Sequence, residues 1–152
     1  TAGSFTTNRE EPANTAAYTF TFDRPVDNLS FTILDIDSTD RTIQPESPNQ
    51  DFWDIVWLSA VNVSSPVSYS QTKADSTHLL GDGSFSNPWR ARNSNSSVEP
   101  SSTVGNVTVS FAEPLTQFTV YYGHGLRKRG GPADPGQNIF ISNLSFTHSV
   151  CR

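Results

Sequence analysis

The sequence predicts an all-β protein, an antiparallel β-sandwich of jelly-roll-like form with long polar loops, in which residues 1–152 make a single domain. Apolar and polar residues alternate with a period of two in segments along the whole chain, which is the pattern of half-buried strands. Turn residues separate these segments, and no stretch shows the 3.6-residue period of an amphipathic helix. About eight or more strands without helices are typical of a sandwich or a jelly roll.

The first two strands are expected at 17–23 and 29–37. In the first, aromatic residues alternate with threonines. In the second, Leu29, Phe31 and Ile33 share one face, so this face is expected to point into the core.

The middle of the chain is less regular. A long strand is expected at 52–63, followed by a short polar strand at 66–72 near a sheet edge. Segment 73–102 is dense in turn residues, and we expect only small strands there, around Leu79-Leu80 and Trp89.

Clear alternation returns in the last third of the chain. Strands are expected at 105–113, 115–123 and 137–146. In the last of these the apolar spacing slips by one residue, which predicts a bulge near Ser142-Asn143.

Two of these segment pairs resemble each other. Residues 18–33 and 107–122 both read as strand, proline-containing turn and strand, with equivalent positions at Phe22 and Phe111. The repeat predicts two similar hairpins packed as neighbouring pairs. The alternative is that one favoured turn was used twice.

Composition limits the classes of function. Only 34% of the 152 residues are hydrophobic and 16% are charged, a balance typical of secreted all-β modules. Ten Phe, four Tyr and three Trp argue against disorder. The net charge of −5 argues against nucleic acid as a partner. No apolar run reaches membrane-spanning length, so membrane insertion is not expected. The single cysteine, Cys151, excludes an internal disulfide, and the start of the chain shows no signal-peptide pattern, so we expect a mature or excised domain.

Acidic residues at the end of the second strand form the first candidate site. Alternation places Phe31, Ile33, Asp35 and Asp37 on one face, so an apolar row ends in two carboxylates. Burying an unpaired charge costs several kcal/mol, so the acidic half is expected beyond the core, at the rim of the sandwich.

Further acids follow across the next loop, and they converge with the first two if strands 29–37 and 52–63 end near each other. Ca²⁺ takes six to eight oxygen ligands from flexible loops. We therefore predict a structural Ca²⁺ site, with Asp37 and Asp54 as its central ligands. The candidate ligands are Asp35, Asp37, Asp40, Asp51 and Asp54. The alternative is that Asp35 and Asp37 cap turns by accepting backbone N–H bonds from loop 38–50.

Aromatic residues form the second candidate site. Trp53 and Trp57 lie on one face of the expected strand 52–63, and one of its two faces must point outward. If the tryptophan face does so, it could stack sugar rings, with Trp89 and Tyr122 as further candidate ligand-binding residues. The alternative is that long loops cover both tryptophans and make them part of the core.

Enzymatic motifs are absent from the sequence. The three histidines are widely spaced, no G-x-S-x-G elbow occurs, and the pair Asp51 and Asp54 is the only weak candidate for a glycosidase site. We therefore expect no enzyme.

Four segments together resemble a module of extracellular, cell-surface and adhesin-like proteins of Gram-positive, especially actinobacterial, bacteria. They are residues 18–38, 52–56, 106–121 and 137–146. The resemblance implies a β-sandwich module of a larger surface protein without a well-established catalytic activity, and it fixes no ligand. The basic loop 127–129 and Asn143 depart from the pattern.

These observations favour a non-catalytic adhesion or display module, secreted or at the cell surface and stabilised by Ca²⁺. Its partner would be a carbohydrate or a macromolecule of a host or surface. One alternative is a carbohydrate-binding module with a tryptophan stacking surface. Another is a structural spacer without a ligand.

Overall fold

The computed structural model describes residues 15–39, 52–93, 96–124 and 138–148, and these residues form strands, turns and loops without a helix. Within these residues there is therefore no helix that could cross a membrane. The strands are β1 (Thr15–Leu34), β2 (Ser38–Thr39), β3 (Phe52–Asn62), β4 (Ser65–Pro66), β5 (Ser70–Lys73), β6 (Leu79–Leu80), β7 (Arg90–Ala91), β8 (Val107–Ser110), β9 (Leu115–His124), β10 (Phe140–Ile141) and β11 (Ser145–His148).

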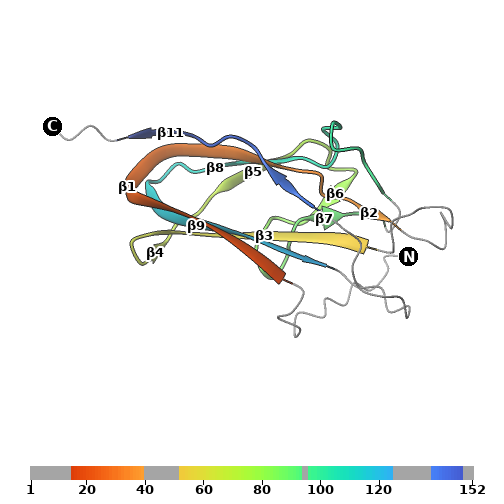
Figure 1. Ribbon diagram of the computed structural model, residues 1–152, viewed down its shortest axis with the longest axis horizontal. Helices are drawn as coiled ribbons and strands as arrows, with labels where there is room; N and C mark the ends of the chain where they lie inside the picture. Colours follow the sequence, from red (N-terminus) through yellow and green to blue (C-terminus); the bar gives the residue numbers. More distant parts are fainter. Residues whose placement is uncertain (1–14, 40–51, 94–95, 125–137, 149–152) are drawn as a thin grey trace.

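The predicted antiparallel β-sandwich is confirmed, and both of its layers belong to one curled sheet. The strands follow the order β2-β3-β9-β1-β8-β5, and every pairing is antiparallel. Strand β1 bends sharply and runs through both layers (Figure 1). Its first half pairs with β9, which in turn pairs with β3, whereas its second half pairs with β8, β10 and β11.

The two predicted hairpins are wrong, because the halves of each repeat do not pair with each other. In the first half of β1 Tyr18 pairs with Val120, and in the second half Phe31 pairs with Val109. Each repeat is therefore an arch that crosses from one layer to the other. A hairpin and an arch have the same alternation and the same turn residues, so the local sequence does not distinguish them.

The two arches meet at equivalent positions. Val26 and Leu115 occupy the same place in the repeat, they pair with each other, and both are completely buried. Such a contact is expected where an approximate twofold axis relates two halves of a structure. The repeat therefore corresponds to two equivalent arches and not to the two predicted hairpins.

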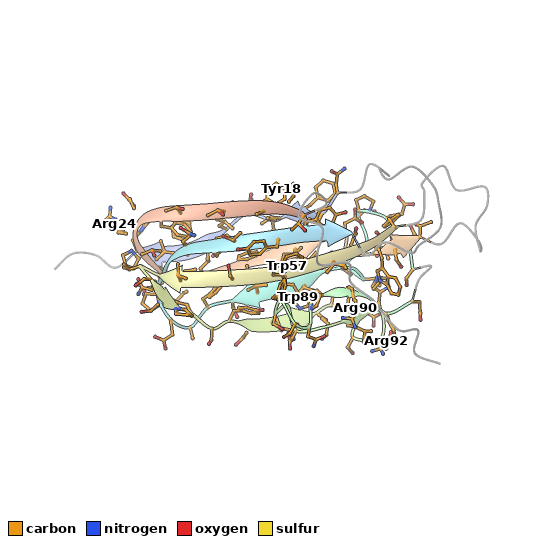
Figure 2. The ribbon with its side chains drawn as sticks, turned by 90° about the horizontal axis from the view of Figure 1, so that it is seen from below. Tyr18, Arg24, Trp57, Trp89, Arg90 and Arg92 are labelled. Atoms are coloured by element: carbon orange, nitrogen blue, oxygen red, sulfur yellow. The ribbon has the colours of Figure 1, made fainter. Side chains whose placement is uncertain are left out.

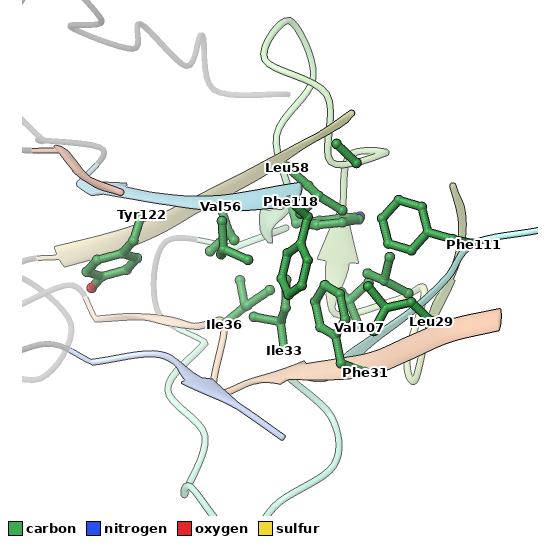
Figure 3. Packing of buried hydrophobic residues seen from close by; sticks show 14 of the residues in the cluster. Leu29, Phe31, Ile33, Ile36, Val56, Leu58, Val107, Phe111, Phe118 and Tyr122 are labelled. Atoms are coloured by element: carbon green, nitrogen blue, oxygen red, sulfur yellow. The ribbon is translucent and has the colours of Figure 1, made fainter. Parts of the chain in front are cut away.

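The core lies between the layers and is rich in aromatic rings (Figure 3). Phe118 on β9 is completely buried. Its ring stacks on Phe20 at 4.6 Å and on Phe31 at 4.7 Å between ring centroids, so it joins the two halves of β1. Buried aromatic pairs of this kind stabilise a core beyond the area they bury.

Trp89 closes the side of the molecule where the curled sheet is open, between β3 and β5. Its backbone pairs with Val56 of β3, with N–O distances of 2.8 and 3.0 Å. Its indole N–H donates to the Gln71 side chain on β5 at 3.1 Å. Gly83 lies against the indole ring and has a φ of 83°, so any side chain at this position would meet the ring. Trp89 is completely buried and completes the core.

The remaining strands mostly follow the sequence predictions. Strand β3 agrees with the long predicted strand, β5 lies at the end of the sheet order, and β6 and β7 are the small strands expected in the turn-dense middle. The last predicted strand is broken into β10 and β11, with residues 142–144 between them. The irregular apolar spacing thus marks a break between strands.

We expect Phe118→Ala to lower the free energy of unfolding by about 3–5 kcal/mol, because it leaves a cavity between Phe20 and Phe31. Urea denaturation monitored by circular dichroism measures this loss. Phe140→Ala is the control: Phe140 is 49% exposed, so we expect a change of about 0.5 kcal/mol or less. Equal effects of the two substitutions would contradict the role assigned to Phe118.

Candidate functional site

The acidic segment after β1 lies next to the start of β3, which was the condition for the acids to converge, but Asp37 and Asp54 are buried rather than beyond the core. Strand β1 ends at Leu34, and β2 then pairs with β3. As a result the Asp54 N–H donates to the Asp37 carbonyl at 3.0 Å, and the Asp37 N–H donates to Asp54 Oδ2 at 3.1 Å. Ile36, the residue before Asp37, is completely buried and donates its N–H to the Gly105 carbonyl at 3.1 Å. The two acids are thus held against each other inside the rim.

Each carboxyl of this pair has further hydrogen-bond partners. The Tyr122 hydroxyl donates to Asp54 Oδ1 at 2.8 Å, and the Val98 N–H donates to Asp37 Oδ2 at 2.9 Å. The two carboxyls lie close enough to influence each other's pKa. Asp54 is completely buried and Asp37 is 5% exposed. We call Asp37 and Asp54 the acid pair.

Burial and mutual repulsion favour a proton on the acid pair. Burial raises the pKa of Asp37 to about 6, and the charge of Asp35 adds to this effect. Burial, followed by the charge of Asp37, raises the pKa of Asp54 well above its usual value. The pKa of Tyr122 is raised too, by burial and by Asp54, so its hydroxyl remains a donor. Two carboxyls this close together titrate as a unit, and one shared proton relieves their repulsion.

Asp35 lies beside the acid pair in an unusual conformation. Its φ is 71°, in the left-handed region that aspartate tolerates better than most residues. Its Oδ1 atom is buried and has no hydrogen-bond partner among the described residues. Burial, with the charge of Glu99, raises its pKa.

The predicted Ca²⁺ site is only partly within the described residues. Asp40 and Asp51 lie outside them. In the part of the chain that the structure describes, no group of three or more His, Cys, Asp or Glu side chains is arranged to hold a metal ion. The Val98 contact of Asp37 is of the kind that the turn-cap alternative describes, although it comes from loop 96–106 and not from loop 38–50. Calcium binding therefore stays a prediction.

The tryptophan row of β3 lies on the outer side of the sheet and is partly covered, because Ile55, between the two tryptophans, is only 5% exposed. The row that contains Asp54, Val56 and Leu58 is buried between the layers. Trp53 and Trp57 are partly buried, and alternation along β3 places both on the side opposite the buried row. Figure 2 labels Trp57 on this strand. The Trp53 indole N–H donates to the Ala91 carbonyl at 2.9 Å.

Three aromatic rings gather on this outer surface. Trp57 stacks on its cross-strand partner Tyr121, with a centroid distance of 5.1 Å and an interplanar angle of 4°. Phe85 meets Trp57 edge to face at 5.7 Å and is 58% exposed. We call Trp57, Tyr121 and Phe85 the aromatic face.

Trp89 and Tyr122 do not belong to this face. Trp89 is completely buried, and Tyr122 is 7% exposed with its hydroxyl on the acid pair. Their burial leaves no ring surface for an external ligand. Tyr121 takes the outward place because Phe118, Val120 and Tyr122 form the inward row of β9.

The loop that carries Phe85 is held by many hydrogen bonds. Asp82 accepts from the Ser84 N–H at 2.9 Å and from the Asn87 side chain at 3.3 Å, and the Ser84 bonds lower the pKa of Asp82. The Lys73 ammonium donates to the Gly81 carbonyl at 2.7 Å. The sequence GDGS at 81–84 is typical of an ordinary turn, and nothing in it indicates that the loop positions a ring beside Trp57. The aromatic face is thus organised in advance of any ligand.

The acid pair predicts an unusual dependence of stability on pH. Folding raises the pKa of Asp37 from near 3.8 to about 6, so the folded protein binds this proton more tightly than the unfolded chain does. The contribution of this carboxyl to the free energy of unfolding is complete below pH 3.8 and is lost as the pH rises through about 6. We therefore expect the protein to lose on the order of 2–3 kcal/mol of stability between pH 4 and pH 7.5. Thermal or urea unfolding across this range measures the loss.

Asp37→Asn is the matching variant, since an amide keeps an acceptor for Val98 and cannot ionise. It should reduce the pH dependence and leave only the part that comes from the burial of Asp54, whereas Asp23→Asn, at an exposed site of β1, should preserve it in full. A wild-type protein that is equally stable at pH 4.5 and pH 7.5 would contradict proton sharing by the acid pair.

No protein-family model, curated protein or solved structure matches the chain. The likeness to surface modules of Gram-positive bacteria thus rests on the strand patterns of this sequence. The acid pair inside the molecule and the aromatic face outside it are the features of the described residues that bear on function.

Proposed function

We propose that the chain is a non-catalytic carbohydrate-binding module that serves adhesion in a larger secreted or cell-surface protein, and that the aromatic face contacts the ligand. The observation that carries this proposal is the outward stack of Trp57 on Tyr121, extended by Phe85. The C–H bonds of a sugar ring carry partial positive charge and pack against the negative faces of aromatic rings.

The organisation of the face supports a binding role. Trp57 and Tyr121 project from neighbouring strands in the middle of a sheet, and Phe85 is carried by a hydrogen-bonded loop. Side chains held in this way lose little conformational freedom when a ligand arrives, which favours affinity. A partly exposed aromatic cluster on a sheet surface is also a common mark of an interaction site.

The acid pair supports the non-catalytic part of the proposal. A general acid or base must come within hydrogen-bond reach of its substrate. Asp54 is completely buried, and its carboxyl is engaged by Tyr122 and by the Asp37 N–H. Asp54 is therefore a poor partner for the glycosidase pair considered from the sequence.

We expect titration with soluble oligosaccharides of cellulose, xylan, mannan and chitin to shift the tryptophan fluorescence with at least one of them. Trp57→Ala should weaken the binding at least roughly tenfold, because it removes the central ring of the face. Phe140→Ala, which removes an exposed ring from the other layer, is the control and should bind as the wild type does.

Binding that is unchanged in Trp57→Ala would exclude the aromatic face as the contact surface. The lack of any response to the whole panel, with Trp57 accessible to a soluble quencher, would exclude these carbohydrates and leave the spacer or a protein ligand.

We also expect Ca²⁺ to stabilise the module, because a bound cation would offset the repulsion between the carboxyl groups near the rim. Millimolar Ca²⁺ should raise the melting temperature, and a chelator should reverse the change. Asp35→Asn should weaken the effect, because Asp35 Oδ1 has no partner among the described residues. A melting temperature unchanged by either reagent would exclude calcium.

A further inference from the structure

The first half of β1 forms an open edge of the sandwich. Residues 15–21 pair with β9 on one side, and no other described strand pairs with them on the opposite side. The second half of β1 differs, since it is flanked by β8 on one side and by β10 and β11 on the other. In Figure 2 the first half of β1 lies outermost, next to β9 and then β3. We call residues 15–21 the β1 edge.

The β1 edge lacks the features that usually block strand addition. Unprotected edges pair readily with other strands, and proteins discourage this with charged side chains, prolines or very short edge strands. The sequence of the β1 edge, TAAYTFT, contains neither a charge nor a proline, and residues 15–19 are all exposed. The edge strand of the other layer, β5, spans only Ser70–Lys73 and ends in a lysine.

The β1 edge is also complementary to itself. An antiparallel pair centred on Tyr18 would place Tyr18 opposite its own copy, with both rings on the same side of the sheet. Ala16 would then face Phe20, a small residue against a large one. On the outer side Ala17 would face Thr19, and Thr15 would face Thr21. None of the opposing residues is charged. Most of the residues of the β1 edge are β-branched or aromatic, which are the types that favour strands.

We propose that two copies of this chain associate through their β1 edges, in a symmetric antiparallel pair centred on Tyr18. Tyr18 is 51% exposed in the single chain although it lies in the inward row of β1, between Ala16 and Phe20. The copy would cover this ring with an equivalent one. A twofold pair of this kind closes on itself, so it yields a dimer and not a filament.

The pair should be weak and sensitive to salt. A single strand pair buries less surface than a stable permanent dimer needs, which is on the order of 1,000 Å² or more. Each copy has a net charge of −5, so the copies repel each other at low ionic strength. Association should therefore depend on concentration and strengthen with added salt.

The pair has a consequence for binding that rests on the proposed function. Opposing residues of two paired strands point to the same side, so the β3–β9–β1 layers of the copies would form one continuous sheet. Both aromatic faces would then lie on the same surface. Two such faces could hold one polysaccharide chain, and the second contact would gain from its high effective concentration.

Sedimentation velocity of the 152-residue chain over a wide concentration range tests the dimer, and it does so independently of any sugar. We expect a monomer–dimer equilibrium for the wild type. Tyr18→Lys and Tyr18→Glu should each weaken it roughly tenfold or more, because they place like charges opposite each other and remove the aromatic pair. An equimolar mixture of the two variants should form a one-to-one dimer, since the charges are then opposite.

Phe140→Lys, at a residue of β10 that is 49% exposed, is the control and should dimerise as the wild type does. Circular dichroism verifies that each variant is folded. A wild type that stays monomeric at millimolar concentration would overturn the proposal, and so would dimers that persist in both single variants. Hydrogen exchange of residues 15–21 that is slow and independent of concentration would also overturn it, because the edge would then be covered within one chain.

If the dimer forms and no sugar binds, the proposed carbohydrate function fails while the edge pairing stands. If sugars bind to a chain that remains monomeric, the edge pairing fails and the carbohydrate function stands.

Discussion

The passage of β1 through both layers is the constraint on which the rest of the fold depends. Because one strand pairs with β9 before its bend and with β8 after it, the two layers cannot shift relative to each other without breaking a continuous backbone. The buried pair Val26 and Leu115 fixes the bend, and Phe118 packs against rings from both halves of the strand. This leaves the first half of β1 at an open edge and brings the end of the second half back to β3. Both candidate sites follow from this arrangement.

The segment after β1 runs back to β3 and brings two carboxyl groups together in the interior. This opposes folding, and neighbouring groups offset part of the cost. The Asp54 N–H donates to the Asp37 carbonyl directly beside the β2–β3 pairing, and the Asp37 N–H donates to the Asp54 carboxyl, so the sheet pairing brings the two acids together. Buried like charges would oppose folding. A shared proton and donors from Tyr122 and Val98 reduce that cost. The predicted cation would act by the same principle, because it too would supply positive charge where carboxylates meet.

The sequence predicted most strands, because alternation is a local property. It indicated that the acids could meet but not that they do, because their nearness depends on the pairing of β2 with β3. It failed where two arrangements share one local pattern. An arch and a hairpin both read as strand, turn and strand, so the pairing of β1 with β8 and β9 could not be recognised. The inward place of Trp89 depends on a gap between β3 and β5 that only the curled sheet creates. The outward place of Tyr121 could have been inferred, since alternation from Phe118 already turns Tyr122 inward.

The two layers of the sandwich have unlike outer surfaces, and this difference bears on where a ligand binds. Outside the β5–β8–β1 layer the paired positions carry short hydroxyl side chains, and Thr32 and Thr108 bond to each other there at 3.1 Å. The partly exposed stacked rings, Trp57 on Tyr121, lie on the opposite layer, which also carries the open edge of β1. Strands β10 and β11 cover β1 only in the hydroxyl-rich layer. A ligand that binds an aromatic surface and a strand that pairs with an open edge would therefore contact the same layer. Ligand binding and self-association through this layer would then be physically linked.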